Sequence, residues 1–154
     1  MNRFYDQIAD EYDSLVQEDV QANRFPYAAY NHLQDIIADY IAGNKHLSKV
    51  KVLDIGIGTG SLYEKIMPEK IDITGIDNSK TMLEIAHMRL PEARLISFDI
   101  QKGIPQALKQ ENFDYIVINY LFKHFDHPMI TATINQLVKL LAPFGKIFIG
   151  DILF

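Results

Sequence analysis

The chain has 154 residues, 48% of them hydrophobic, with a net charge of −5 and a pI near 5.4. This length predicts a single domain with a buried core, and the acidic balance gives no basis for a nucleic-acid or anionic-membrane partner. The absence of cysteine excludes disulfides and thiolate metal sites and is typical of the cytoplasm. The acidic N-terminus lacks the apolar core of a signal peptide, and no apolar run reaches the roughly 18–20 residues of a membrane helix.

The first predicted element is a helix over residues 2–13. Phe4, Ile8 and Tyr12 recur there at intervals of four, which is the spacing of one helix face. Residues 14–25 are polar and weakly patterned, so we expect a mobile connection or lid in that segment.

A longer helix is predicted from Pro26, because proline suits the first turn of a helix. Its end is predicted at Gly43 and Asn44, since glycine commonly terminates helices. The apolar face of this helix comprises Leu33, Ile36, Ile37, Tyr40 and Ile41. Together the two helices form a predicted N-terminal cap over residues 1–45.

The stretch 51–77 carries the main functional signal. An apolar run ends at Asp54, a glycine-rich loop and an amphipathic turn follow, and a second apolar run ends at Asp77. This order predicts a strand, a glycine loop, a short helix and a strand, a unit that binds nucleotide-like ligands at the carboxyl ends of its strands. Asp77 is placed to accept hydrogen bonds from both hydroxyls of a ribose.

The spacing of the glycines indicates which ligand the loop binds. Gly56 lets the chain turn sharply out of the strand, Gly58 lets the backbone approach a ligand, and Gly60 lets the next helix pack closely. A dinucleotide-binding G-x-G-x-x-G pattern would require glycine where the chain has Ser61. The observed G-x-G-x-G, with Asp54 two residues before it, resembles the first motif of the class I S-adenosylmethionine-dependent methyltransferases. A glycine-rich turn of another α/β domain is the alternative.

This resemblance implies S-adenosylmethionine as the cofactor and suggests contacts for its adenine. After the ribose acid, Asn78 and Met82 would flank the ring, although a methionine at helical spacing is more commonly a core residue. The next strand, over residues 94–100, carries Asp99 near its end. Asp99 would accept a hydrogen bond from the adenine amine and the backbone of Ile100 would meet the ring, with a solvated acid as the alternative.

The resemblance extends to the first helix. A pattern that caps the cofactor pocket in this family is matched by Phe4-Tyr5-Asp6, Ala9 and Tyr12-Asp13. Tyr12 would then reach the methionine end of the cofactor, and simple packing of its ring is the alternative.

The fourth predicted strand is buried and ends at Asn119, which we expect to face the ligand crevice. His124, Asp126 and His127 follow in a loop. Adjacent loop side chains rarely converge on one ion and no further ligand is evident, so we expect no metal site. By resemblance, His124 lies near the methyl-transfer site, and His124 or Tyr12 could serve as a base if the acceptor arrives protonated.

The C-terminal part of the chain predicts a helix over residues 128–142 and a fifth strand over residues 146–151 that continues to Phe154. The turn between them resembles the family's Leu-x-Pro-Gly-Gly, with Phe144 in place of the first glycine and Gly145 retained. The fifth strand would be an apolar sheet edge. Because the family continues with two more strands, we expect either a homodimer through this edge or a truncated form of a longer protein.

Five strands that alternate with helices predict a doubly wound, Rossmann-like α/β fold, with a mostly parallel sheet and helices on both faces. We expect one domain over residues 1–154, with its Rossmann-like core over residues 50–154. The predicted function is S-adenosylmethionine-dependent methyl transfer to a small-molecule acceptor in the cytoplasm. A non-catalytic module that binds S-adenosylmethionine and an NAD-linked oxidoreductase are the alternatives.

Overall fold

The computed structural model describes residues 2–43, 49–66 and 71–151. Its centre is a five-stranded sheet in the order β3-β2-β1-β4-β5, and every neighbouring pair is parallel. The strands are β1 (Val50–Ile55), β2 (Ile71–Asp77), β3 (Arg94–Ser97), β4 (Phe113–Asn119) and β5 (Leu141–Gly150). The predicted doubly wound α/β fold is therefore confirmed.

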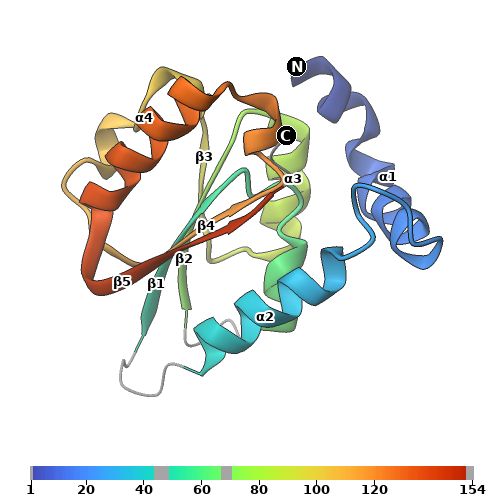
Figure 1. Cartoon of the computed structure of the whole chain (residues 1–154), viewed down its shortest axis with the longest axis horizontal. Coiled ribbons are helices and arrows are strands. Elements are labelled where there is room, and N and C mark those ends of the chain that lie inside the picture. The colour runs from blue at the N-terminus through green and yellow to red at the C-terminus, as the bar shows by residue number, and fades with distance from the viewer. Residues whose placement is uncertain (1, 44–48, 67–70, 152–154) are drawn as a thin grey trace.

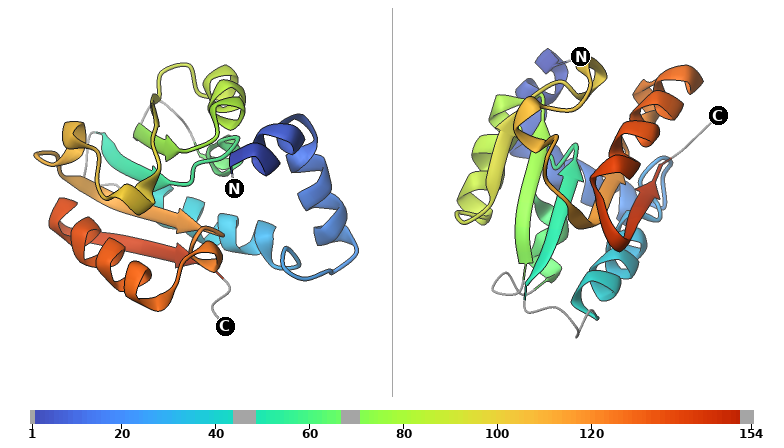
Figure 2. Two further views of the ribbon diagram at one scale, coloured as in Figure 1. Left: turned by 90° about the horizontal axis from the view of Figure 1, so that it is seen from above. Right: turned by 90° about the vertical axis from the view of Figure 1, so that its left-hand side faces the viewer.

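Helices cover both faces of this sheet (Figure 1). The first face carries α2 (Tyr30–Ala42), the short 3-10 helix η1 (Ser61–Lys65) and α3 (Lys80–Arg89). The opposite face carries α4 (His127–Leu137). Helix α1 (Asn2–Gln21) packs mainly against α3, and its N-terminal part lies beside the carboxyl ends of the strands (Figure 2). Among the described residues, no helix is both long and apolar enough to cross a membrane.

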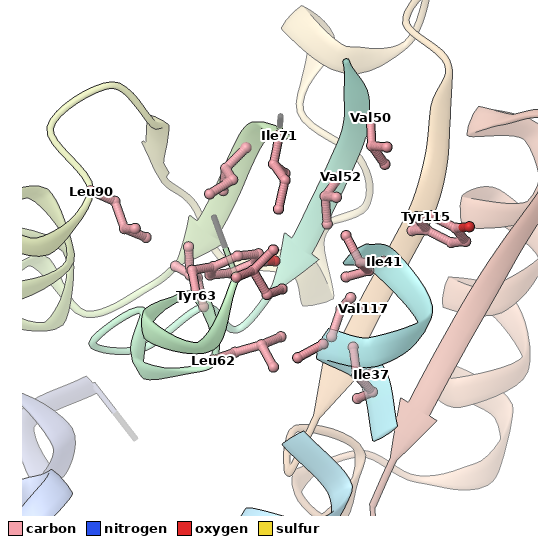
Figure 3. Close-up of a cluster of buried hydrophobic side chains, with 14 of the residues drawn as sticks. Ile37, Ile41, Val50, Val52, Leu62, Tyr63, Ile71, Leu90, Tyr115 and Val117 are labelled. Atoms are coloured by element: carbon pink, nitrogen blue, oxygen red, sulfur yellow. The ribbon is translucent and has the colours of Figure 1, made fainter. Parts of the chain in front are cut away.

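The core on the α2 side joins the helices to the sheet (Figure 3). Ile37 and Ile41 of α2 belong to the same buried cluster as Val52 of β1 and Val117 of β4. Each is at most 1% exposed. Full burial of such a side chain contributes about 1.5–3 kcal/mol, so this cluster fixes α2 beside the two central strands.

The core on the α4 side uses the alternate residues of the same strands. Leu53 of β1 and Ile116 of β4 are fully buried there, together with Phe122 and Leu137. Successive side chains of a strand point to opposite faces of a sheet. Strands buried on both faces therefore read as the continuous apolar runs seen in the sequence.

The strand order reverses between β1 and β4. From β1 the chain builds outward through β2 to β3, whereas β4 and β5 lie on the other side of β1. In open sheets of this kind, ligands bind in the crevice beyond the carboxyl ends of the strands at this reversal. The loops after β1 and β4 therefore form the expected binding position.

The N-terminal helix is longer than the sequence pattern predicts. Residues 14–25 were expected to form a connection or lid, but α1 continues to Gln21. Val16 is buried, and Gln17 exchanges two side-chain hydrogen bonds of 3.1 Å with Asn31 of α2. These tertiary contacts stabilise a helix that the weak apolar pattern did not reveal.

Other element boundaries also differ from the predictions. The helix predicted from Pro26 begins at Tyr30, because residues 24–30 form successive turns. The helix predicted to reach residue 142 gives way after Leu137 to a 3-10 turn, and β5 begins at Leu141 with an irregular register against β4. The third strand ends at Ser97 rather than residue 100. The positions predicted at Asn44 and at residues 152–154 lie outside the described residues.

Candidate functional site

A pocket opens at the reversal of the sheet and encloses about 1050 Å³, including space open to solvent. All predicted cofactor contacts except Gly60 line it. These residues are Tyr12, Asp54, Gly56, Gly58, Asp77, Asn78, Met82, Asp99, Ile100 and Asn119, and His124 lines it as well. Side chains from α1, from the loops after β1, β2, β3 and β4, and from α3 thus converge on one space.

The glycine loop after β1 presents backbone to this pocket. Gly58 has φ of +55° and a Cβ at that position would meet no atom within 4 Å, so the backbone faces open space. Gly60 has a different role, because a Cβ there would lie 2.8 Å from Leu90 Cδ1. Gly60 therefore permits the loop to pack against the end of α3 and lies behind the pocket lining.

Asp54 is a buried carboxyl group at the end of β1. Its burial raises its pKa from 3.8 to about 7, an effect that the nearby Tyr63 hydroxyl partly offsets and the charge of Asp77 reinforces. The folded protein therefore holds the Asp54 proton to a higher pH than a solvated carboxyl group does.

Asp77 connects the second strand to the glycine loop. One of its carboxylate oxygens accepts from Gly58 N–H at 2.9 Å, and the other accepts from Ser79 N–H at 2.9 Å. Burial raises the pKa of Asp77, and the backbone donors oppose that rise. Each carboxylate oxygen can accept more than one hydrogen bond, so these contacts orient the group and leave capacity for ligand hydroxyls.

The pocket beyond Asp77 has apolar walls. Met82 is 2% exposed on α3, and Ile100 begins a short 3-10 helix whose N-cap is Asp99. Asp99 accepts from Gln101 N–H at 3.1 Å and lines the pocket. Phe98 also lines this part. Phe98 was not among the residues predicted from the sequence, although an aromatic residue directly before a strand-end acid is a readable signal.

Tyrosines line the opposite part of the pocket. Tyr5 and Tyr12 come from α1, Tyr30 from the start of α2, and Tyr120 from the turn after β4. Burial raises the pKa of Tyr12 strongly and raises those of Tyr5 and Tyr30 to about 12, so their hydroxyls remain protonated near neutral pH. The ring of Tyr27 packs against Tyr12, Tyr30 and Tyr120 from outside. Tyr5 was predicted only as part of the motif that caps the pocket and not as a contact of its own, although it lies seven residues before Tyr12 on the same helix face.

His124 lies at the border of this tyrosine-lined part. Its Nε2 is 2.9 Å from the Tyr5 hydroxyl, with which it shares a hydrogen bond. Partial burial and the neighbouring Lys123 ammonium lower the pKa of His124, which favours a neutral imidazole at neutral pH. Asp126 instead caps α4 by accepting from Met129 N–H at 2.8 Å. Within the described part of the chain, no three His, Asp or Glu side chains are grouped as a metal site.

The pocket has features that fit the nucleoside cofactor expected from the sequence. The Gly58 backbone borders open space, and Asp77 offers an oriented acceptor for hydroxyl groups. The Asn119 side-chain oxygen is buried with no hydrogen-bond partner among the described residues, although it lines the pocket. A buried acceptor without a partner is costly, so this atom is suited to receive a donor from a ligand.

Comparison with known proteins identifies the family to which the chain is similar. A family model described as a methyltransferase domain matches residues 52–145. An uncharacterised methyltransferase of Bacillus mycoides is 33% identical over 155 residues, covering 99% of this chain and 68% of the relative. A second uncharacterised methyltransferase, from Bacillus cereus, matches to the same extent.

A solved structure supports the same fold. The complex of DhpI with SAH superposes with a TM-score of 0.70 at 19% identity, covering 97% of this chain and 66% of DhpI. The chain therefore spans slightly less than two thirds of that solved protein. At this identity, the likeness concerns the fold.

Proposed function

Because the chain belongs to the class I S-adenosylmethionine-dependent methyltransferases, which use S-adenosylmethionine as cofactor, we propose that it transfers a methyl group to a small-molecule acceptor. The observation that carries this proposal is the convergence of residues predicted separately along the sequence on one pocket at the reversal of the sheet. The acceptor would bind in the tyrosine-lined part of that pocket.

The cofactor half of the pocket follows from the donors and acceptors present. S-adenosylmethionine supplies a methyl group already activated on a sulfonium, so the protein's main task is alignment. In the proposed arrangement, Asp77 accepts the ribose hydroxyls and Gly58 gives the ligand access to the backbone. Asn78, Met82, Asp99 and Ile100 would hold the adenine, and Asn119 and Tyr12 would border the methionine end.

Within the described residues, the acceptor half offers His124 as a suitable base. His124 and Tyr12 were the candidate bases from the sequence, and their environments shift their pKa values in opposite directions. The raised pKa of the Tyr12 hydroxyl keeps it protonated, whereas the lowered pKa of His124 keeps its imidazole neutral. An acceptor that arrives protonated would therefore give its proton to His124, and Tyr12 would serve as part of the wall.

A transfer assay tests this function directly. Metabolites would first be screened for those that raise the melting temperature of the chain in the presence of S-adenosylhomocysteine. Each positive compound would then be incubated with methyl-labelled S-adenosylmethionine and with wild-type or His124→Gln protein. We expect labelled product from the wild type and a slower rate from the variant. Binding of the cofactor with no transfer to any compound would favour the non-catalytic module instead.

Two further properties belong to this proposal. The first is self-association through β5, which is an edge strand of the sheet. Ile149 of this strand is 42% exposed. The second is a cytoplasmic location, which the absence of cysteine supports.

A further inference from the structure

Helix α1 is attached to the cofactor pocket by polar contacts at both ends of its pocket-facing segment. Near its start, Asp6 accepts from the Ser79 hydroxyl at 2.5 Å, and Tyr5 shares its hydrogen bond with His124. Two turns later, Asp13 accepts from the Thr59 hydroxyl at 2.8 Å. Since Tyr5 and Tyr12 line the pocket between these attachments, α1 forms one of its walls.

Arg89, which does not line the pocket, contacts both Asp13 and Thr59. Its guanidinium lies 2.6 Å from the Asp13 carboxylate and 3.1 Å from the Glu64 carboxylate, and it donates to the Thr59 carbonyl at 3.2 Å. One side chain at the end of α3 thus links α1, the glycine loop and η1. The planar guanidinium can do this because its donors point in fixed, divergent directions, which a lysine cannot reproduce.

Thr59 is the point at which this cluster acts on the glycine loop. The residue is 2% exposed and lies between Gly58 and Gly60, both of which have positive φ. Its hydroxyl is held by Asp13 and its carbonyl by Arg89. Glycines on both sides leave the backbone many accessible conformations, so these two contacts restrict the loop between Gly58 and Gly60.

We propose that Arg89 and Asp13 are positioning residues that hold α1 and the glycine loop together around the cofactor and thereby set its rate of exchange. This inference rests on the proposed cofactor site, but neither side chain lines the pocket. Their action passes through Thr59 and through the tyrosines of α1. Release of the cofactor then requires the Asp13 contacts to break, so that α1 can move away from the loop.

Arg89 contributes to this cluster through several contacts at once. The Arg89 and Asp13 side chains are 28% and 31% exposed, and a single ion pair at such a site contributes little. Loss of Arg89, however, removes contacts to Asp13, Glu64 and Thr59 at once. The effect on cofactor exchange should therefore exceed that of an ordinary exposed ion pair.

The test compares dissociation rates of S-adenosylhomocysteine from wild type, Arg89→Gln, Asp13→Asn and the double variant, measured by stopped-flow displacement. We expect each single variant to release the ligand roughly tenfold faster, with a smaller change in the association rate. The double variant should resemble the singles, because residues of one network are not additive. Arg89→Lys should recover only part of the wild-type behaviour, and added salt should accelerate release from wild type more than from the variants.

The matched control is Arg94→Gln, which removes the 2.5 Å ion pair between Arg94 of β3 and Glu111 before β4, neither of which lines the pocket. It should leave the dissociation rate unchanged. Wild-type dissociation from folded Arg89→Gln or Asp13→Asn would overturn the proposal, as would equal acceleration in the control. If the wild type binds no S-adenosylhomocysteine, the cofactor assignment fails instead, so the two failures are distinguishable.

Discussion

At the scale of single residues, Asp54 links the binding loop to the stability of the fold. Its carboxyl group lies in the buried second half of β1, just before Ile55, and beside Tyr63 and Asp77. Removal of this group from water favours its neutral form. The folded chain therefore releases the Asp54 proton at a higher pH than the unfolded chain does.

The pH dependence of stability follows from that shift. Between pH 3.8 and about 7, the folded state retains the Asp54 proton that the unfolded state has lost. The contribution of this group to the free energy of unfolding therefore falls as the pH rises through that window and is constant above it. In urea unfolding at several pH values, Asp54→Asn should remove this part of the decline and be relatively more stable at pH 8. Parallel pH profiles for the variant and the wild type would contradict this interpretation of Asp54.

The sequence predicts strand-end residues of the pocket well but misses the residues that support them. Asp54, Asp77 and Asn119 are predictable because each follows a readable apolar strand, and parallel strands bring such ends together. The roles of Thr59 and Arg89 depend on how α1 and α3 pack, and no local pattern encodes that arrangement.

At the scale of elements, the same distinction explains the errors in the helices. Strands β1, β2 and β4 are apolar on both faces, and α3 has a strong local signal in its Ser79 N-cap, which accepts from Met82 N–H at 3.2 Å. The second half of α1 lacks such a signal, and contacts with α2 and α3 stabilise it instead. Tertiary contacts commonly override weak local preferences in this way.

The β5 edge carries a separate prediction about association. Backbone groups on the outer side of an edge strand can pair with a second chain, and β5 is such a strand. Its Ile149 side chain is exposed. The Lys146 ammonium of the same strand lies 4.7 Å from the centroid of the Tyr40 ring. We expect concentration-dependent dimers in light scattering, and Ile149→Lys should shift them towards monomers. Ser97→Lys, on the opposite edge strand β3, is the control and should leave the dimers intact. A wild type that stays monomeric at every concentration would contradict self-association through β5.

At the scale of the whole molecule, the sheet order explains why one pocket collects residues so far apart in the sequence. The reversal between β1 and β4 leaves a crevice, into which the glycine loop enters from one side and the segment after β4 from the other. Helix α1 then closes the space with Tyr5 and Tyr12. The proposed cofactor half thus carries readable motifs, whereas the side chains of the proposed acceptor half come from segments that are distant in the sequence.

The most direct test of this account is a calorimetric titration of the chain with S-adenosylhomocysteine, applied also to Gly58→Val and Gly103→Val. Both glycines have positive φ, so both substitutions strain the backbone, but only Gly58 lines the pocket. We predict saturable one-to-one binding to wild type and Gly103→Val, at least roughly tenfold weaker binding to Gly58→Val, and no binding of NADH. Absence of binding to wild type, or equal binding to folded Gly58→Val, would contradict the proposed cofactor pocket.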